Sequence, residues 1–265
     1  MYYYIVDPQK ISQREFERVQ NELYSSLSLY HIAGEVVRVT GVRTINQLVE
    51  NAFAREVKTL VAVGSDETLH DVINAVGSRE MVIGFIPLIK TELGKILGIR
   101  DITQAIKTLA SRRIAELDLG MVNMGNYFLG KISFGLENNF QPIEIKFSAN
   151  NEYQASLIVA GGLIINSRYD FSDDSKITDP SDAVLDLLLL PKLSRWQTFW
   201  HRNQISSGNF EKIPQASMLH VKKLEITSPV GLALKLEGRV LARTPATVDV
   251  LPQALKIIVS KERTF

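Results

Sequence analysis

Short apolar runs alternate with longer helix-like segments in the first part of the chain. Four runs have the length and composition of buried strands: 2–6, 35–39, 59–63 and 82–87. Between them, apolar residues recur at helical spacing, and two of these segments open with capping boxes, Ser12 with Glu15 and Thr44 with Gln47. Strands that alternate with helices predict βαβ units on a parallel sheet.

The hydrophobic period changes to two after about residue 112. Eight segments with this period are typical of strands: 114–119, 127–134, 143–147, 155–165, 184–190, 219–226, 232–236 and 254–259. A helical pattern returns at 194–202. The sequence therefore predicts an α/β domain with a parallel sheet over residues 1–112, followed by an all-β, β-sandwich-like domain over residues 113–265.

The composition narrows the class of protein. The 265 residues include 30 Lys+Arg and 29 Asp+Glu, which gives a net charge of +1, and they contain no cysteine. A disulfide scaffold, a thiolate zinc site and a cysteine nucleophile are therefore excluded. The near-neutral charge argues against a nucleic-acid partner. Because neither a signal peptide nor a membrane-spanning run is visible, we expect a cytoplasmic protein.

Three polar segments follow strands of the first domain, at the edge where parallel sheets bind their ligands. They are Asp7–Pro8, 64–68 and 89–92. In the second segment, Gly64, Ser65 and Asp66 connect a buried strand to a helix N-terminus. Backbone N–H groups and the helix dipole favour a phosphate there, and a carboxylate could bind Mg²⁺. An ordinary helix start is the alternative interpretation of this turn.

Four stretches stand out in order along the chain. They are LVAVGSDETLHDVINAV at 60–76, IGFIPLIKTELGKILGI at 83–99, SDAVLDL at 181–187, and the segment 234–259, which contains Glu237-Gly238-Arg239. Together they resemble the motifs of the diacylglycerol kinase and related lipid kinase family. The resemblance implies a nucleotide-binding α/β domain and a β-rich domain with the active site in the cleft. It also implies transfer of the γ-phosphoryl group of ATP to a lipid hydroxyl, with Mg²⁺ and a carboxylate general base.

The resemblance further implies roles for individual residues. Glu237 stands where the family has its catalytic aspartate base, and Asp66 would contact the metal-bound phosphate. Mg²⁺ would be held by Asp66 and Asp182, although a turn that caps the next strand is the alternative interpretation of Asp182. The nucleotide would be bound by residues from all three polar segments: Asp7, Pro8, Gly64, Ser65, Asp66, Thr68, Lys90 and Thr91.

The motifs on the nucleotide side are altered in this chain. Ser65 and Glu67 replace two glycines of the family's Gly-Gly-Asp-Gly-Thr motif, and Arg239 replaces the glutamate of Asp-Gly-Glu. Glu67 adds a negative charge beside an anion, a contact that costs about 1 kcal/mol at about 4 Å in water. Two hypotheses follow: a lipid kinase with impaired catalysis, or a non-catalytic relative that binds a lipid, a nucleotide or a protein partner. NAD kinase-type chemistry is a third.

An aromatic face is expected on the helix at 194–202. Trp196, Phe199 and Trp200 lie at i, i+3 and i+4, with Arg195 and Arg202 beside them. Such a face could make a peripheral contact with a membrane surface. The alternative is a face that packs on the β domain or at a homodimer contact.

Two local features of the second domain also give expectations. Four aspartates, Asp118, Asp173, Asp174 and Asp179, are interpreted as exposed loop carboxylates. Gly161-Gly162 is interpreted as a bulge within the expected strand 155–165.

Overall fold

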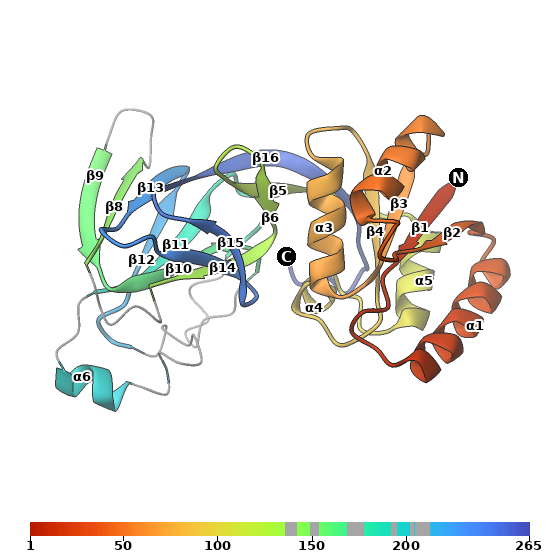
Figure 1. The fold of residues 1–265 in the computed structure, drawn as a ribbon, viewed down its shortest axis with the longest axis horizontal. Coiled ribbons are helices and arrows are strands. Elements are labelled where there is room, and N and C mark those ends of the chain that lie inside the picture. Colours follow the sequence, from red (N-terminus) through yellow and green to blue (C-terminus); the bar gives the residue numbers. More distant parts are fainter. Residues whose placement is uncertain (136–141, 149–153, 169–177, 192–194, 202–203, 205–212) are drawn as a thin grey trace. The chain divides into compact units, whose positions relative to one another are not determined.

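The computed structural model describes the chain except for residues 136–141, 149–153, 169–177, 192–194, 202–203 and 205–212. The chain divides into two compact units (Figure 1). Unit 1 comprises Met1–Leu117 and Gln253–Phe265, and unit 2 comprises Asp118–Pro252. Within the described part of the chain, none of the helices is long and apolar enough to span a membrane.

A parallel sheet forms the centre of unit 1. Its strands are β1 (Tyr2–Val6), β2 (Gly34–Arg38), β3 (Thr59–Gly64), β4 (Val82–Pro87) and the last residues of β16 (Ala246–Ile258). Their order is β2-β1-β3-β4-β16, and every neighbouring pair is parallel. β3 is buried along its whole length, as expected for a strand that is covered on both faces.

Helices cover this sheet. They are α1 (Gln13–Leu29), α2 (Ile45–Ala54), α3 (Asp66–Val76), α4 (Glu92–Ile96) and α5 (Ile102–Ser111). α2 packs against α3, and α1 packs against α5. Right-handed crossovers place these two pairs on opposite faces of the sheet. The predicted capping boxes at Ser12 and Thr44 are both formed, so the starts of α1 and α2 follow from local sequence.

The register of the strands brings three loops to one edge of the sheet. Val6 in β1 is paired with Val63 in β3, and Gly64 is paired with Pro87 in β4. The segments that follow β1, β3 and β4 therefore start at the same edge, where parallel sheets bind their ligands.

Unit 2 contains the antiparallel part of a ten-stranded sheet, which continues through β16 from the parallel strands, and a separate six-stranded antiparallel sheet. In the first, β13 (Lys223–Thr227) lies between the start of β16 and β8 (Ile143–Ser148), β9 (Gln154–Val159) pairs with β8, and β5 (Ile114–Val122) pairs with β16 and β6 (Asn126–Phe128). The second has the order β12-β11-β10-β7-β14-β15. Its strands are β12 (Ser217–Val221), β11 (Leu185–Leu190), β10 (Gly161–Asn166), β7 (Gly130–Phe134), β14 (Ala233–Leu236) and β15 (Arg239–Arg243). α6 (Arg195–Trp200) lies between β11 and β12 in the sequence.

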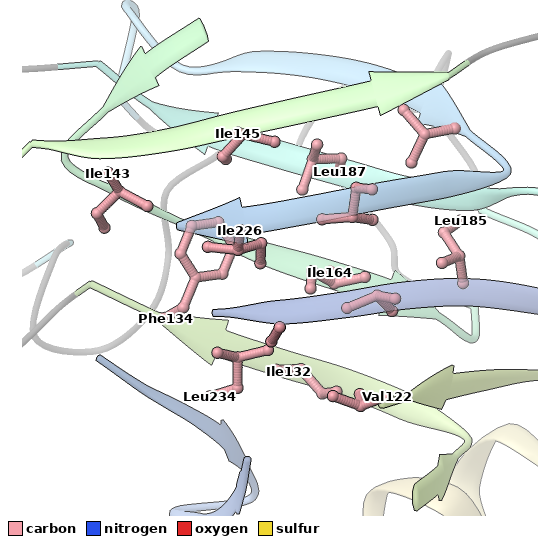
Figure 2. Packing of buried hydrophobic residues seen from close by; sticks show 14 of the residues in the cluster. Val122, Ile132, Phe134, Ile143, Ile145, Ile164, Leu185, Leu187, Ile226 and Leu234 are labelled. Atoms are coloured by element: carbon pink, nitrogen blue, oxygen red, sulfur yellow. The ribbon is translucent and has the colours of Figure 1, made fainter. Parts of the chain in front are cut away.

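The core of unit 2 comes from alternate residues of both sheets. Figure 2 shows Ile145 and Ile226 from the first sheet together with Ile132 and Leu234 from the second, and all four are fully buried. The period of two in the sequence reflects this inward face. The predicted fold class, an α/β domain followed by a β-sandwich-like domain, is confirmed.

The expected strand 155–165 is wrong in detail, because it is two strands. β9 belongs to the first sheet of unit 2 and β10 to the second, so the chain changes sheets at Ala160. Gly161 and Gly162 therefore begin β10 and do not form a bulge within one strand. Gly162 is required by close packing, since a Cβ atom there would lie 2.6 Å from the carbonyl oxygen of Leu188.

The C-terminal segment belongs to unit 1. The sequence-based division places every residue after 112 in the second domain, whereas Gln253–Phe265 is part of the first compact unit. Ile257 in β16 is paired with Ile83 in β4, and the N–H group of Ser260 donates a 3.0 Å hydrogen bond to the carbonyl of Leu97. The parallel sheet thus takes a strand from the far end of the chain.

Candidate functional site

The turn from β3 into α3 is built on Gly64. A Cβ atom at this position would lie 2.3 Å from the side-chain oxygen of Thr68, so glycine allows Thr68 to fold back onto the strand end. The N–H group of Ser65 donates to that oxygen, Oγ1, over 3.1 Å. Gly64, Ser65, Asp66 and Thr68 are all buried. The predicted helix start is therefore a closely packed turn.

Asp7 joins the loop after β1 to this turn. The Thr68 hydroxyl donates to Oδ2 of Asp7 over 3.2 Å, and the N–H group of Asp7 donates to the carbonyl of Val63 over 2.8 Å. Oδ1 of Asp7 accepts from the N–H group of Gln9. Pro8 is half-buried beside it. The structure thus brings the predicted residues Asp7 and Thr68 together, with their side chains bonded to each other.

Asp66 points toward the start of α4. Its Oδ2 atom accepts hydrogen bonds from the N–H groups of Glu92 (2.9 Å) and Leu93 (3.3 Å). The residue is 7% exposed, and Oδ1 is buried without a hydrogen-bond partner. Burial raises the pKa of Asp66 to about 6, while the hydrogen bonds from Leu93 and Glu92 oppose that rise.

Thr91 caps the same short helix. Its hydroxyl oxygen accepts from the N–H group of Gly94 over 3.1 Å. Lys90 is exposed just before it. The 89–92 segment therefore reaches the same edge of the sheet as the other two loops, and its polar groups bond to α4 and to Asp66.

Glu67 forms an ion pair with Lys10. Lys10 Nζ lies 3.1 Å from Oε1 of Glu67, with the two side chains 48% and 38% exposed. The pair spans the loops after β1 and β3 at their exposed surface. The two residues are 57 positions apart in the sequence, so their contact depends on the register of β1 against β3.

Asp182 lies in unit 2, before β11. Its Oδ1 atom accepts from the N–H group of Val184 over 3.1 Å, as a turn residue that caps the strand does. Partial burial raises its pKa above the ordinary value, and the nearby charges of Asp179 and Asp118 add to this effect. Among the residues that the structure describes, no group of three or more His, Asp or Glu side chains could hold a metal ion.

The interpretation of Asp118 as an exposed loop carboxylate is wrong. It is fully buried in β5, and its Oδ2 atom accepts from the N–H group of Ala183 over 2.6 Å. Ala183 has a left-handed backbone conformation with φ 61°. Asp118 thus holds the turn that contains Asp182. Asp179, by contrast, is exposed as expected, and Asp173 and Asp174 lie outside the described residues.

Glu237 lies at the tip of a β-hairpin. Leu236 of β14 is paired with Arg239 of β15, which leaves Glu237 and Gly238 as a two-residue turn. Their φ angles are 51° and 85°, as a type I′ turn requires. Glu237 and Asp182 belong to unit 2, and the predicted nucleotide residues belong to unit 1.

A buried carboxylate in β11 was missed by the sequence interpretation. Asp186 is 3% exposed and lies opposite His220 of β12, with 2.6 Å between Oδ1 and Nδ1. Burial raises the pKa of Asp186 to about 6, and His220 opposes the rise. The available signal was an aspartate inside the apolar run 185–190.

The fold of this chain, a parallel α/β unit and an antiparallel β unit, is similar to solved structures of two kinds of kinase. A diacylglycerol kinase of Bacillus anthracis str. Sterne has a TM-score of 0.77 at 14% identity, over 99% of this chain and 98% of that chain. An NAD kinase of Archaeoglobus fulgidus has a TM-score of 0.58 at 12% identity, over 99% and 95%. At such identities these similarities show the fold alone.

Sequence comparison matches most of the chain to two family models. The diacylglycerol kinase catalytic domain model matches residues 2–122, and the YegS C-terminal NAD kinase beta sandwich-like domain model matches residues 141–259. A diacylglycerol kinase of Bacillus subtilis (strain 168) is 21% identical over 81% of this chain and 82% of its own length. The chain belongs to the diacylglycerol kinase-like lipid kinase family.

Proposed function

We propose that this protein is a lipid-kinase relative in which ATP-dependent phosphoryl transfer is impaired. One observation carries the proposal: the charged side chains of the 64–68 turn are bonded within unit 1. Asp66 bonds to α4, and Glu67 bonds to Lys10. A phosphate that approaches this turn meets the carboxylate of Glu67, and Lys10 is already neutralised by that carboxylate. Phosphoryl transfer is catalysed mainly by positioning and by electrostatic stabilisation of the phosphates. Both contacts therefore weaken the catalysis that this turn could support.

The donor set also fits Mg²⁺ poorly. Of the two Asp66 oxygens, Oδ2 already accepts two N–H groups. Mg²⁺ requires near-octahedral oxygen coordination, usually from one or two carboxylates together with water and phosphate. Among the described residues, Asp66 belongs to no group of three or more His, Asp or Glu side chains that could hold a metal ion, and its other oxygen, Oδ1, is buried. The side chains of this turn therefore do not complete a Mg²⁺ site.

Calorimetry with ADP and Mg²⁺ tests this proposal. The native protein is expected to show no saturable binding below about 1 mM, equivalent to about −4 kcal/mol. Glu67→Gly is expected to create or strengthen binding, because it removes the charge and restores the glycine of the family motif. Glu56→Gly, at a left-handed residue after α2, is the matched control and should leave binding unchanged. Tight ADP binding by the native protein would contradict the proposal.

An active ATP- and Mg²⁺-dependent lipid kinase is the second candidate. The observation that favours it is the buried Asp66, whose raised pKa of about 6 and unpartnered Oδ1 suit a catalytic carboxylate. Under this alternative, the native protein phosphorylates diacylglycerol from labelled ATP, and both Asp66→Asn and Glu237→Gln abolish the product. Activity that survives Glu237→Gln would exclude Glu237 as the base.

We also propose that α6 contacts a membrane surface. Trp196 and Trp200 are each 74% exposed, which is unusual for indole side chains. Tryptophan partitions favourably to the membrane–water interface. The structure does not describe the side chain of Phe199.

Vesicle cosedimentation tests this contact. Trp196→Ala combined with Trp200→Ala is expected to weaken binding to phosphatidylcholine–phosphatidylglycerol vesicles by at least about tenfold, or about 1.4 kcal/mol. Tyr24→Ala, at a 46% exposed aromatic residue of α1, is the control. Unchanged vesicle binding with an altered molar mass in light scattering would instead assign the aromatic face to a homodimer contact.

A further inference from the structure

β9 is the last strand of the ten-stranded sheet, beside β8 (Figure 1). It pairs with β8 along its whole length, and among the described strands none pairs with its other side. Ser156, Leu157 and Ile158 are all exposed, Leu157 to 41% and Ile158 to 70%. An open strand edge with exposed aliphatic side chains can bind a further strand through backbone hydrogen bonds.

The sequence of β9 lacks the features that usually prevent sheet edges from associating. Exposed edge strands commonly carry charged residues or proline. At the other ends of the two strand orders, β2 carries Glu35 and Arg38, β15 carries Arg239 and Arg243, and β12 carries His220. β9, with the sequence QASLIV, contains neither a charged residue nor a proline. Of these four edges, β9 therefore opposes association with another strand least.

The two exposed aliphatic side chains of β9 lie on opposite faces of the sheet. Leu157 is paired with Ile145, which is fully buried in the core of unit 2, so Leu157 lies at the open end of that core. Ile158 is paired with the exposed Glu144 on the outer face. A strand added to this edge would cover apolar surface on both faces.

β9 is complementary to a second copy of itself. In an antiparallel pair, residues that lie directly opposite each other share a face of the sheet. A two-fold axis at Leu157 therefore places it opposite the partner's Leu157, where the two side chains close the open ends of both cores. The same axis places Ile158 opposite the partner's Ser156, a small side chain that leaves room for it.

The charges of β8 favour this register over its neighbours. Glu144 is paired with Ile158, and Lys146 is paired with Ser156. With the axis at Leu157, Glu144 lies in the same row of side chains as the partner's Lys146. An axis at Ser156 would align two lysines, and an axis at Ile158 would align two glutamates. Charges three strand spacings apart, about 14 Å, select the register more than they add affinity.

We propose that β9 pairs antiparallel with β9 of a second copy of this chain, with the two-fold axis at Leu157. Such a contact uses the same surface of both copies and covers the open side of both strands, so it stops at a dimer. It lies within unit 2 and involves neither the nucleotide loops nor α6. Its test therefore does not depend on the proposed loss of phosphoryl transfer.

Light scattering of the full chain tests the contact. Because the interface is short, the native protein is expected to change from the mass of one chain toward that of two over about 1–100 µM. Ile158→Lys is expected to keep the mass of one chain throughout, since it places a charge in the contact. Its fold should be retained, because this side chain is 70% exposed in the single chain. Val42→Lys, at an 84% exposed residue of unit 1, adds the same charge and should dimerise normally.

Three outcomes of this measurement overturn the proposal. They are a native protein that keeps the mass of one chain, an Ile158→Lys variant that still dimerises, and a dimer that dissociates when Trp196→Ala and Trp200→Ala are combined. The last outcome would assign the contact to α6.

Cross-linking tests the register independently. The chain contains no cysteine, so Leu157→Cys introduces one thiol into each copy. Opposite residues of an antiparallel pair have Cα atoms about 4.5–5.5 Å apart, which a disulfide can bridge. Under mild oxidation, Leu157→Cys is expected to form a covalent dimer at least about tenfold faster than Ile158→Cys, whose two thiols are offset by two positions along the strands. Thermal unfolding confirms that both variants are folded. Equal rates for the two variants overturn the proposed pairing.

Discussion

At the scale of single residues, Asp66 links the stability of the protein to pH. Its folded-state pKa of about 6 lies above its ordinary value of 3.8 because the carboxylate is buried. The folded protein therefore binds a proton that the unfolded chain releases at lower pH. The resulting stabilisation is present below about pH 4 and is lost as the pH rises through about 6. Two pKa units correspond to roughly 3 kcal/mol.

Asp66→Asn removes this dependence. Asparagine keeps an oxygen acceptor for the N–H groups of Glu92 and Leu93 but carries no charge. We expect the free energy of unfolding of the variant, relative to the native protein, to rise by up to about 3 kcal/mol between pH 4 and pH 7. Urea unfolding across this range measures it. Asp101→Asn, at the exposed cap of α5, is the control. If this difference in the free energy of unfolding does not change with pH, the pKa of Asp66 is the same in the folded and the unfolded protein.

The sequence placed Asp66 at the correct edge of the sheet but did not identify its partners. A glycine after a buried strand is a local signal, and it predicted the turn. The N–H groups that Asp66 accepts belong to residues 26 and 27 positions later, and they reach it because β4 lies beside β3. The Lys10–Glu67 pair, 57 residues apart, has the same origin. Contacts of this kind depend on strand order, which the sequence pattern does not state.

At the scale of elements, the β14–β15 hairpin turns on a residue that suits the turn poorly. Glu237 has φ 51°, a left-handed conformation that glycine, asparagine and aspartate adopt more easily than glutamate. The family motif has aspartate at this position. The chain therefore retains the hairpin geometry with a less favourable residue.

Glu237→Asn is expected to stabilise the protein. It should raise the free energy of unfolding by roughly 0.5–1 kcal/mol, because asparagine tolerates the type I′ turn better. Chemical denaturation measures the change. The same substitution at Glu225, exposed in the middle of β13, should be destabilising, since asparagine is disfavoured in strands. A loss of stability at position 237 would show that the glutamate side chain holds the turn.

Elements with local signals were predicted well, and those without them were not. The starts of α1 and α2 follow from capping boxes that span three residues each. The strand 155–165 was expected as one element because its apolar run continues through Ala160, where the chain changes sheets. β15 was missed because its short apolar segment is bordered by two charged residues, Arg239 and Arg243.

At the scale of the whole molecule, the order of four motifs predicted the family and the two-part architecture. The sequence could not predict that β16 serves both units. Its first residues pair with β13 in unit 2, and Lys256 and Ile257 pair with β4 in unit 1. The buried residues Leu255, Ile257, Ile258 and Val259 complete this end of the parallel unit.

The return of the chain to unit 1 has a consequence for its synthesis. A ribosome makes β1 to β4 first, but their sheet lacks its last strand until the C-terminal residues emerge. Until then, β4 presents unpaired backbone groups, the feature through which sheet edges associate with other chains. The unit that is translated first therefore cannot finish folding until unit 2 has been translated. This reverses the usual N-terminal-first order of domain folding.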